Sequence, residues 1–377
     1  MPEDAPRLDV DALLDDPATR IVVCTGSGGV GKTTTSAALA LRAAERGRKV
    51  VVLTIDPARR LAQSMGIERL DNTPRPVPDV DGPGTLDAMM LDMKRTFDEV
   101  VEGQASPEKA AQILANPFYQ VLSSSFAGTQ EYMAMEKLGQ LHKDALKTAR
   151  WDLIVVDTPP SRSALDFLDA PERLSSFLDG RFIRIMLAPA RGPARLMTAG
   201  LSVVTNALTK VLGAQILRDM QTFVAAMDTM FGGFRARAQQ TFALLQAPGT
   251  AFVVVAAPEA DALREAAFFV ERLAGEDMPL AGLVVNRASR VRFEGLSAEQ
   301  ATAAAERLDA TGDDATAVTA GLLRLHADRT RIVARETHLR QRFAAAHPHV
   351  PTAVMPALST DVHDLDGLRQ VGDLLTG

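Results

Sequence analysis

The chain has little of the residue types that mark several common protein classes. Cys24 is its only cysteine, and a lone cysteine forms neither an internal disulfide nor a cysteine-rich zinc site. Aromatic residues make up 5% of the chain, and 41 lysines and arginines are outnumbered by 47 acidic residues. No basic stripe with interleaved aromatic residues occurs. Because nucleic-acid binding needs clustered positive charge, we expect no nucleic-acid partner.

Targeting signals are lacking as well. The N-terminal stretch MPEDAPRLDVDALLDD is acidic and does not have the basic-then-apolar layout of a signal peptide. Apolar residues at 46% and charged residues at 23% are ordinary for a globular protein. We therefore expect a cytoplasmic protein with at most peripheral membrane contact.

What the chain does have is a series of short apolar runs separated by helix-forming stretches. The first run is followed at once by glycines, and the helical stretch 32–46 stops at Gly47. The runs are apolar on both faces, as strands of a buried parallel sheet are, so they predict a doubly wound, mostly parallel α/β sheet. The strand candidates are residues 20–25, 50–55, 86–91, 153–156, 252–256, 282–285 and 352–355.

The glycine-rich segment GSGGVGKT follows the first strand candidate, opens the first helix candidate and fits G-x-x-x-x-G-K-[ST]. Glycines let backbone N–H groups converge on phosphate oxygens, and a helix N-terminus attracts anions. We assign catalytic Lys32 to the β- and γ-phosphates of ATP or ADP and the Thr33 hydroxyl to Mg²⁺. The alternative is a plain glycine-rich turn. The expected nucleotide-binding residues here are Gly26, Ser27, Gly28, Gly29, Val30, Gly31, Lys32, Thr33 and Thr34.

Two aspartates end strand candidates on either side of this loop. Ligands of open α/β sheets bind beyond the carboxyl ends of the strands, so both can face the γ-phosphate. We assign Asp157 to the Mg²⁺ shell through water and Asp56 to orienting the attacking water, with a water-mediated metal contact as a second possibility. The alternatives are that each caps the following helix, or that the two roles are exchanged.

The spacing of strand candidates is uneven and predicts added helical parts. Residues 170–248 show only helical periodicity, which is too long for a loop inside a compact domain. We expect a doubly wound core with an inserted helical subdomain, and a Pro/Gly-rich surface loop at 71–84. The expected divisions are an N-terminal arm at 1–19, the first part of the P-loop core at 20–170, the helical subdomain at 171–247, and the second part of the core at 248–377 with a helical insert at about 297–345.

An ordered set of segments resembles the family of the arsenite-pump ATPase and the guided-entry ATPase for tail-anchored membrane proteins. GSGGVGKTT resembles the family's deviant Walker A loop GKGGVGKTT, TIDPARRLAQ its switch I, and DTPPSRSALDFL its switch II. AGTQEYMAMEKL, VVVAAPEADALREA, VVNR and MPALSTDV are similar to later family segments. The resemblance implies a dimeric Mg²⁺-dependent ATPase in which Asn286 reads adenine, with Arg287 and Pro356 also in the nucleotide site.

The chain departs from the family pattern at several positions. Ser27 replaces the second lysine of the loop, and Ser163 and Arg59 replace histidines of the switches. The family's zinc-binding C-x-x-C is missing, so we expect no zinc. The cysteine trio that arsenite pumps need is missing too, which disfavours a role as the motor of an anion exporter.

One P-loop per chain implies a dimer by the resemblance. Because a positive group near the γ-phosphate can be worth 10³ or more in rate, two Ser27 subunits would both lack it. We therefore favour a heterodimer with a paralogous subunit that retains the lysine. The alternatives are a slow homodimer, or one that uses Arg59 or Arg60 instead.

The segment 171–247 is where a guided-entry ATPase holds its hydrophobic client. Residues 197–217 carry one ionisable side chain, Lys210, and their apolar positions follow 3–4 spacing, which predicts an amphipathic helix. The apolar side of this helix lines a client groove or, alternatively, packs in the core of the protein. The arginines around it face anionic lipid or water: Arg181, Arg184, Arg191, Arg195 and Arg218.

Three functions compete on this reading. The first is a nucleotide-gated binding machine that couples ATP binding and hydrolysis to a change in affinity for a hydrophobic or membrane-protein client. The second is a regulatory or scaffolding subunit that binds ATP and hydrolyses it weakly. The third is the exporter motor, which the cysteine count disfavours.

Overall fold

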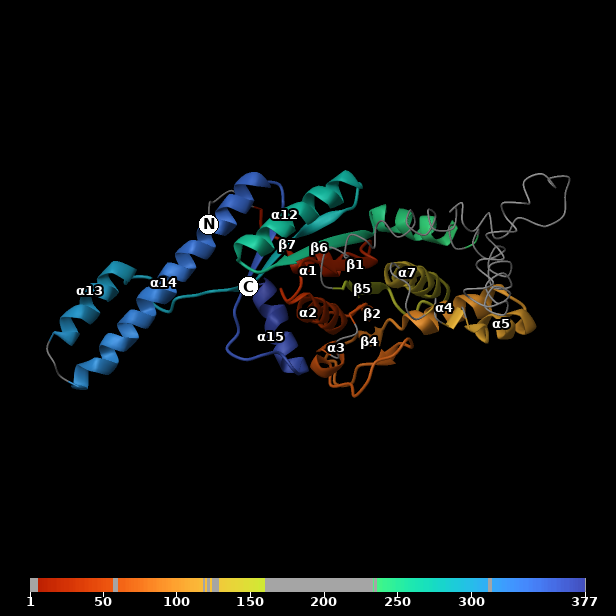
Figure 1. The fold of residues 1–377 in the computed structure, drawn as a ribbon, viewed down its shortest axis with the longest axis horizontal. Helices are drawn as coiled ribbons and strands as arrows, with labels where there is room; N and C mark the ends of the chain where they lie inside the picture. Colours follow the sequence, from red (N-terminus) through yellow and green to blue (C-terminus); the bar gives the residue numbers. More distant parts are fainter. Residues whose placement is uncertain are drawn as a thin grey trace, which may run out of the picture. The chain divides into compact units, whose positions relative to one another are not determined.

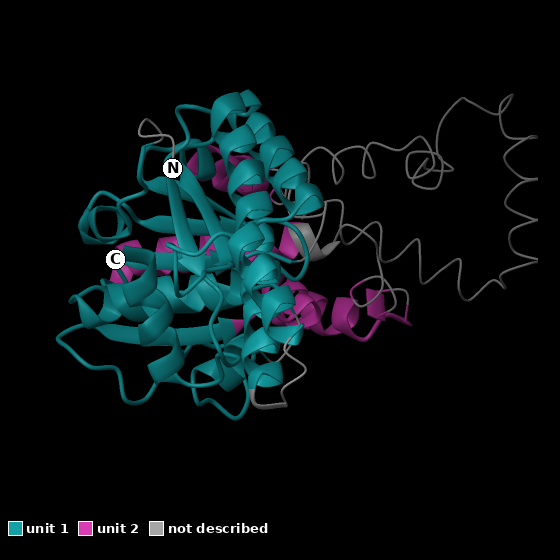
Figure 2. Cartoon of the chain, turned by 90° about the vertical axis from the view of Figure 1, so that its left-hand side faces the viewer, with its two compact units in different colours: residues 1–89, 149–164, 245–377 teal, residues 90–148, 165–244 magenta. Residues whose placement is uncertain are grey.

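The computed structural model of the chain describes residues 6–56, 60–117, 119–120, 123, 129–159, 233, 236–310 and 314–376. The chain divides into two compact units (Figure 2). Unit 1 contains residues 1–89, 149–164 and 245–377, and unit 2 contains 90–148 and 165–244. The helix expected at 197–217, the five arginines around it, and Arg59 and Ser163 lie outside the described residues.

Eight described strands form the sheet in the order β3-β4-β2-β5-β1-β6-β7-β8 (Figure 1). The pairs β2–β5, β5–β1, β1–β6, β6–β7 and β7–β8 are parallel. The predicted α/β class with a mostly parallel sheet is therefore confirmed. The strands are β1 Ile21–Thr25, β2 Lys49–Thr54, β3 Arg75–Pro76, β4 Thr85–Met90, β5 Leu153–Asp157, β6 Thr250–Ala256, β7 Leu280–Ala288 and β8 Thr352–Pro356.

The central strands are buried along their length, as the apolar runs predicted. Every residue of β1, β5 and β6 is buried. Valine and isoleucine suit such positions because their branched side chains pack well on a pleated surface. Residues 71–84 were predicted to form a loop, but they include the two-residue strand β3. This strand pairs antiparallel with Ala88 and Asp87 of β4. Pro76 is tolerated there because β3 is an exposed edge strand.

The described helices of unit 1 pack on this sheet or on each other. Helix α2 contacts β1, β2 and β5, and α12 contacts β6 and β7. Helix α2 ends at Glu45, and Gly47 follows with a φ of 107°, which is the left-handed stop that the sequence predicted. The helices are α1 Val10–Asp15, α2 Lys32–Glu45, α3 Arg60–Ser64, α12 Ala260–Gly275, α13 Ala298–Asp309, α14 Asp314–Ala346 and α15 Leu365–Thr376.

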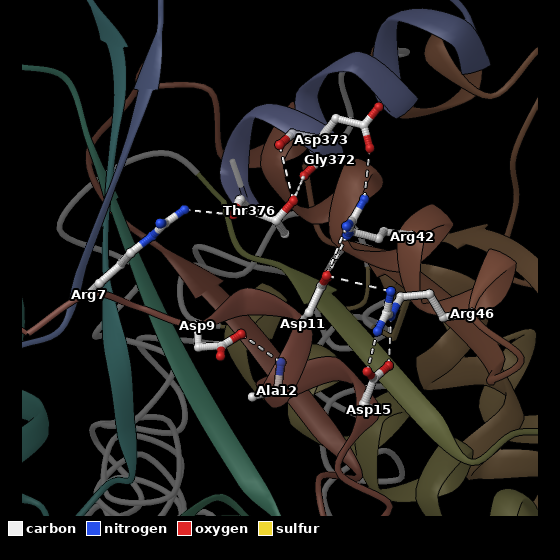
Figure 3. A network of polar contacts seen from close by, with 10 residues as sticks. All are labelled: Arg7, Asp9, Asp11, Ala12, Asp15, Arg42, Arg46, Gly372, Asp373 and Thr376. Atoms are coloured by element: carbon white, nitrogen blue, oxygen red, sulfur yellow. Dashed lines mark hydrogen bonds and ion pairs between the residues drawn. The ribbon is translucent and has the colours of Figure 1, made fainter.

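A network of ion pairs joins α1, α2 and α15 (Figure 3). Arg42 donates from Nε and Nη2 to the two carboxylate oxygens of Asp11 at 2.6 and 2.9 Å, and from Nη1 to Asp373 at 2.9 Å. Arg46 pairs with Asp15. The hydrogen bond from Arg42 holds the pKa of Asp11 below its usual value. These contacts tie the N-terminal residues to the core.

Unit 2 is helical in its described part. It contains α4 Met93–Gln104, α5 Pro107–Leu114 and α7 Thr129–Thr148. Asp92 and Ser106 accept hydrogen bonds from backbone N–H groups and cap α4 and α5. Glu136 on α7 accepts from Arg237 at 2.9 Å. We assigned residues 90–148 to the first part of the core, whereas they form one compact unit with residues 165–244. The predicted domain boundaries stay predictions.

Candidate nucleotide-binding site

The loop from Gly26 to Gly31 joins β1 to α2 at the centre of the sheet. Gly26 has a φ of 150°, and a Cβ there would lie 2.1 Å from the carbonyl oxygen of Val255. Gly31 has a φ of 95°, and its Cβ would lie 2.1 Å from Nδ2 of Asn286. Both positions therefore require glycine, which fixes the path of the loop against β6 and β7.

The N-terminus of α2 is left without a side-chain cap. Its N-cap residue is Gly31, which has no side chain to accept a hydrogen bond from the first turn. The N–H groups of a first helical turn have no partner inside the helix, and they carry the positive end of the helix dipole. An anion placed at this helix end would therefore meet converging donors, which is the arrangement that phosphate groups need.

Lys32 is buried beside this helix end. Its side chain is 5% exposed, and its Nζ donates to the carbonyl oxygen of Ser27 at 2.9 Å. Burial lowers the pKa of Lys32, while the nearby carboxylates of Asp157 and Asp56 oppose that shift. The ammonium group of Lys32 thus lies within the loop rather than in solvent. This is the place where the sequence predicted a group that binds phosphate.

Asp157 ends β5 and lies opposite Cys24 on β1 and Thr54 on β2. Its Oδ2 accepts from the hydroxyls of Thr33 at 2.8 Å and Thr54 at 2.9 Å. Its Oδ1 is buried and has no hydrogen-bond partner in the part of the chain that the structure describes. Burial raises the pKa of Asp157 to about 6, and the two threonine hydroxyls act against this increase.

These groups fit Mg²⁺. A buried carboxylate oxygen that lacks a partner stands next to the Thr33 hydroxyl, and hard divalent cations prefer oxygen ligands. Because Mg²⁺ keeps several waters and phosphate oxygens, it needs only one or two protein ligands. Among the described residues, no cluster of three or more His, Cys, Asp or Glu side chains forms a metal site. The expectation that the protein holds no zinc stays a prediction.

Asp56 lies two residues beyond the end of β2 and is half-buried. Its backbone N–H donates to Oγ1 of Thr54 at 3.2 Å, and its carboxylate is near enough to contribute to the raised pKa of Asp157. The structure therefore brings Asp56 to the same edge as Lys32 and Asp157. Arg60, an alternative source of positive charge, begins α3 and is exposed.

Asn286 and Arg287 lie at the end of β7 and contact the loop through its carbonyl groups. Asn286 donates from Nδ2 to the carbonyl oxygen of Val30 at 2.8 Å, and Arg287 donates to that of Gly29 at 3.0 Å. The strand register shifts between Val285 and Ala288, and Arg287 has a φ of 62°. This irregularity turns both side chains to the loop and holds its carbonyl groups on the β7 side.

The remaining residues that were predicted for the nucleotide site differ in their burial and in their distance from the loop. Pro356 ends β8, is buried and lies opposite Ala288, so it neighbours the end of β7. Thr34 lies half-buried in the first turn of α2, Val30 is buried, and Gly28 is exposed. The oxygen Oδ1 of Asn286 is buried without a partner among the described residues, so it is an acceptor with no assigned donor.

Sequence reasoning missed two threonines. Thr54 donates to Asp157, and Thr158 donates from Oγ1 to the carbonyl oxygen of Cys24 at 2.8 Å. Each stands at or just past a strand end in the segments TIDP and DTPP, next to an aspartate that we singled out. Their positions beside these aspartates could have indicated a role in the site. Their hydrogen bonds could not be predicted, because they depend on the pairing of β5 with β1 and β2.

The class of protein follows from where the loop lies. A Walker-type loop at the carboxyl end of a central strand, in a mostly parallel sheet covered by helices, makes the chain a P-loop nucleoside triphosphatase by fold. A family model described as anion-transporting ATPase matches residues 19–294. The chain belongs to this ATPase family, which includes the arsenite-pump and guided-entry proteins.

Curated relatives support the same family. The chain is 31% identical over 176 residues to the protein named ATPase GET3 of Malassezia globosa, a match covering 47% of the chain and 50% of the relative. It is 29% identical over 263 residues to an ATPase ASNA1 homolog of Cryptosporidium parvum, covering 70% and 63%. An arsenical pump-driving ATPase of Acidiphilium multivorum is 32% identical over 157 residues, covering 41% and 26%.

These matches are partial. The chain spans about half the length of the Malassezia relative and a smaller share of the arsenical pump protein. Among the helices in the described ranges, none combines the length and the apolar character that crossing a bilayer requires.

Proposed function

We propose that the chain binds Mg·ATP at the loop between β1 and α2 and hydrolyses it. One observation supports this above all others: Lys32 and Asp157 are both buried at the uncapped N-terminus of α2, near enough for the charge of each to shift the pKa of the other. A buried charge is costly unless a partner compensates it. A triphosphate with its divalent ion provides such partners for both groups.

The residues divide the work as follows in this proposal. Lys32 and the first-turn N–H groups of α2 bind the β- and γ-phosphates. Thr33 and Asp157 hold Mg²⁺, which when bound supplies positive charge to the phosphate oxygens. Asp56 orients the attacking water, and Asn286, Arg287 and Pro356 form the side of the site that receives the base.

We further propose that the working form is a dimer with a paralogous subunit. Ser27 stands where the family's second lysine reaches across to the partner's nucleotide, and serine carries no charge. Two copies of this chain would leave both γ-phosphates without that group. A paralogue with lysine at this position would complete the site of this chain.

The proposed output is a change in affinity for a hydrophobic segment of a membrane protein. Relatives named ATPase GET3 support this direction. The segment we assign to clients, 171–247, is mostly outside the described residues. Arsenite handling is disfavoured because As(III) sites need several thiolates, and the single thiol, Cys24, is buried with a raised pKa.

A second candidate is a subunit that binds ATP but hydrolyses it weakly while its partner does the chemistry. Ser27 favours this candidate for the same reason that it favours a heterodimer. The two candidates share the nucleotide site and differ only in turnover.

Steady-state phosphate release separates the two. We expect the pure chain to hydrolyse ATP slowly, a paralogue carrying GKGG in its loop to raise turnover, and Asp56→Asn to abolish the increase without loss of ATP binding. If Asp56→Asn in this chain leaves the turnover of the pair unchanged, hydrolysis at this site is refuted and the regulatory candidate stands. Capture of an exposed transmembrane helix, compared with and without a non-hydrolysable ATP analogue, tests the client. Equal capture in both conditions refutes nucleotide gating.

A further inference from the structure

Strand β7 carries two successive side chains that both bind the backbone of the phosphate loop. Asn286 donates from Nδ2 to the carbonyl oxygen of Val30 at 2.8 Å. Arg287 donates from Nη1 to the carbonyl oxygen of Gly29 at 3.0 Å. The two acceptors belong to consecutive peptide groups of the loop. We call Asn286 and Arg287 together the β7 clamp.

A regular strand could not direct both side chains to one loop, because neighbouring residues of a strand point to opposite faces of the sheet. Arg287 departs from the strand conformation. Its φ is 62°, and the pairing of β7 with β8 shifts register between Val285 and Ala288. A left-handed conformation is unfavourable for a residue with a Cβ, so it persists only where the surrounding structure requires it. Here it allows Arg287 to contact the same loop as Asn286.

A clamp on a carbonyl group also sets the direction of an N–H group. In a trans peptide, the C=O of one residue and the N–H of the next lie in one plane and point in opposite directions. Both peptide groups of the loop are trans. Because the β7 clamp binds the carbonyl groups of Gly29 and Val30, the N–H groups of Val30 and Gly31 point to the other side of the loop.

These two N–H groups are available to a ligand. In the part of the chain that the structure describes, neither Val30 nor Gly31 donates a hydrogen bond from its backbone. Gly29 and Gly31 have φ values of 79° and 95°, whereas Val30 between them is not left-handed. Successive N–H groups of such an alternating backbone form a concavity that binds anions. This concavity directly precedes the uncapped first turn of α2 and adds two donors to it.

We propose that Arg287 is a positioning residue for phosphate binding, which acts with Asn286 by holding the N–H groups of Val30 and Gly31 toward the phosphates. The inference rests on the proposed ATP site and adds a role that is independent of the base. The guanidinium group binds the carbonyl side of the loop, so its effect reaches the phosphates through the backbone. Donors that are already in place lose less conformational entropy when the ligand binds.

Calorimetric titration of the full chain with Mg·ATP and with Mg·tripolyphosphate tests this role. Arg287→Met removes the donor and leaves a side chain of similar length. It weakens the binding of both ligands by the same factor, about tenfold, because a hydrogen bond from a charged donor is lost from the loop. Arg287→Lys keeps a positive charge with N–H donors, and its affinities stay within about threefold of the wild type.

A second measurement is made on the protein without nucleotide. NMR order parameters of the backbone N–H groups of Gly29, Val30 and Gly31 report motion on the picosecond to nanosecond scale. In the wild type they are about 0.85, which is typical of rigid backbone, and in Arg287→Met they fall toward about 0.6. This measurement needs no ligand, so it decides the role of the β7 clamp even if the chain binds no ATP. A lack of ATP binding would instead refute the proposed function.

Arg292→Met is the matched control. Arg292 is exposed and follows β7 by four residues, and among the described residues it makes no hydrogen bond to the loop. Its substitution therefore leaves the affinities and the order parameters unchanged. Both arginines are exposed, so all the variants are expected to fold, and the midpoint of urea denaturation checks this.

Four results would overturn the proposal. A loss of affinity for ATP alone, with tripolyphosphate unaffected, would place Arg287 at the base. Equal losses for both ligands with unchanged order parameters would mean that the guanidinium group contacts phosphate directly. Unchanged affinity for both ligands would show that the loop keeps its shape without the clamp. A loss with lysine as large as with methionine would refute the role of the donated hydrogen bond.

Discussion

Glycines of the phosphate loop differ in the space around their Cα atoms. A Cβ at Gly26 would lie 2.1 Å from the backbone oxygen of Val255, whereas a Cβ at Gly29 would meet nothing within 4 Å. Both have positive φ, so alanine is strained at either position. We predict that Gly29→Ala costs about 1 kcal/mol of unfolding free energy, which is the strain alone. Gly26→Ala costs about 3 kcal/mol or more, because backbone must move as well.

Urea denaturation of the two variants and the wild type measures this difference. The free energies compare only if the variants share one m-value, so the slopes are fitted separately. Equal losses at the two positions would show that the close approach of Gly26 to β6 does not constrain the loop.

Ser27 stands where the resemblance to the family predicts a second lysine in the loop. If a positive group at this position reaches a partner's γ-phosphate, Ser27→Lys lets two copies of the chain complete each other's sites. We predict that the substitution raises ATP turnover of the pure chain by about 10³-fold or more. Ser27→Met, with a similar length and no charge, is the control and leaves turnover low.

Turnover is followed by phosphate release over a range of protein concentrations, because the effect requires assembly. An increase with methionine as large as with lysine would refute the role of charge. No increase with lysine at any concentration would refute the proposed reach across the interface.

Local sequence patterns were enough to single out several residues that the structure brings together at the loop, and their roles stay predictions. The loop pattern fixed the choice of Lys32 and Thr33, and the end of a buried strand marked Asp157. The hydrogen bond from Thr54 to Asp157 was not predictable, since it arises from the register of β2 against β5. The contact of Asn286 with the carbonyl oxygen of Val30 was also out of reach, because 256 residues separate the two positions.

At the scale of elements, ion pairs join α1 and α15 to α2, in addition to the apolar side chains that both helices bury. Arg42 binds Asp11 with two hydrogen bonds and also binds Asp373 (Figure 3). The pKa of Asp11 is lowered in the folded chain, so the folded state binds fewer protons than the unfolded state near that pKa. The stabilisation is therefore present above the unfolded pKa of about 3.8 and is lost as the pH falls through the lower folded value.

We predict that Asp11→Asn lowers the free energy of unfolding by about 1 kcal/mol at pH 7, because the pair is partly exposed. The difference from wild type shrinks as the pH falls below about 3.8, where Asp11 of the unfolded chain becomes protonated. Denaturation curves of both proteins at several pH values measure it. Asp261→Asn is the control, because Asp261 belongs to an exposed pair within α12. A penalty for Asp11→Asn that does not change with pH would contradict the assignment.

Buried strands were the elements that sequence predicted best. An apolar run with branched residues buries both faces wherever it lies in a parallel sheet, so its local pattern is enough. The edge strand β3 was missed because two exposed residues, Arg75 and Pro76, carry no apolar pattern. Its pairing depends on the neighbouring β4 rather than on its own side chains.

At the scale of the whole molecule, the α/β class was predictable from sequence, whereas the predicted domain boundaries stay predictions. Helices α4, α5 and α7 group with residues 165–244, although we had assigned them to the core. Helical periodicity shows which face of a helix is buried, and it does not show which neighbour buries it. Segments from distant parts of the sequence therefore cannot be assigned to one unit from periodicity alone.

The central claim for the whole molecule is that one site, built by β1, α2 and β5, binds a triphosphate with its divalent ion. Isothermal titration calorimetry of the full chain with ATP, in the presence of Mg²⁺ or of a chelator, tests it most directly. The account predicts saturable binding of ATP to the wild type, and this binding weakens without Mg²⁺. For Lys32→Ala it predicts a loss of affinity of about 10²-fold or more, because a buried charge-assisted contact is removed. The affinity of the exposed-surface variant Leu146→Gln is unchanged. Equal affinity of wild type and Lys32→Ala, or no uptake of Mg·ATP by the wild type, would contradict it.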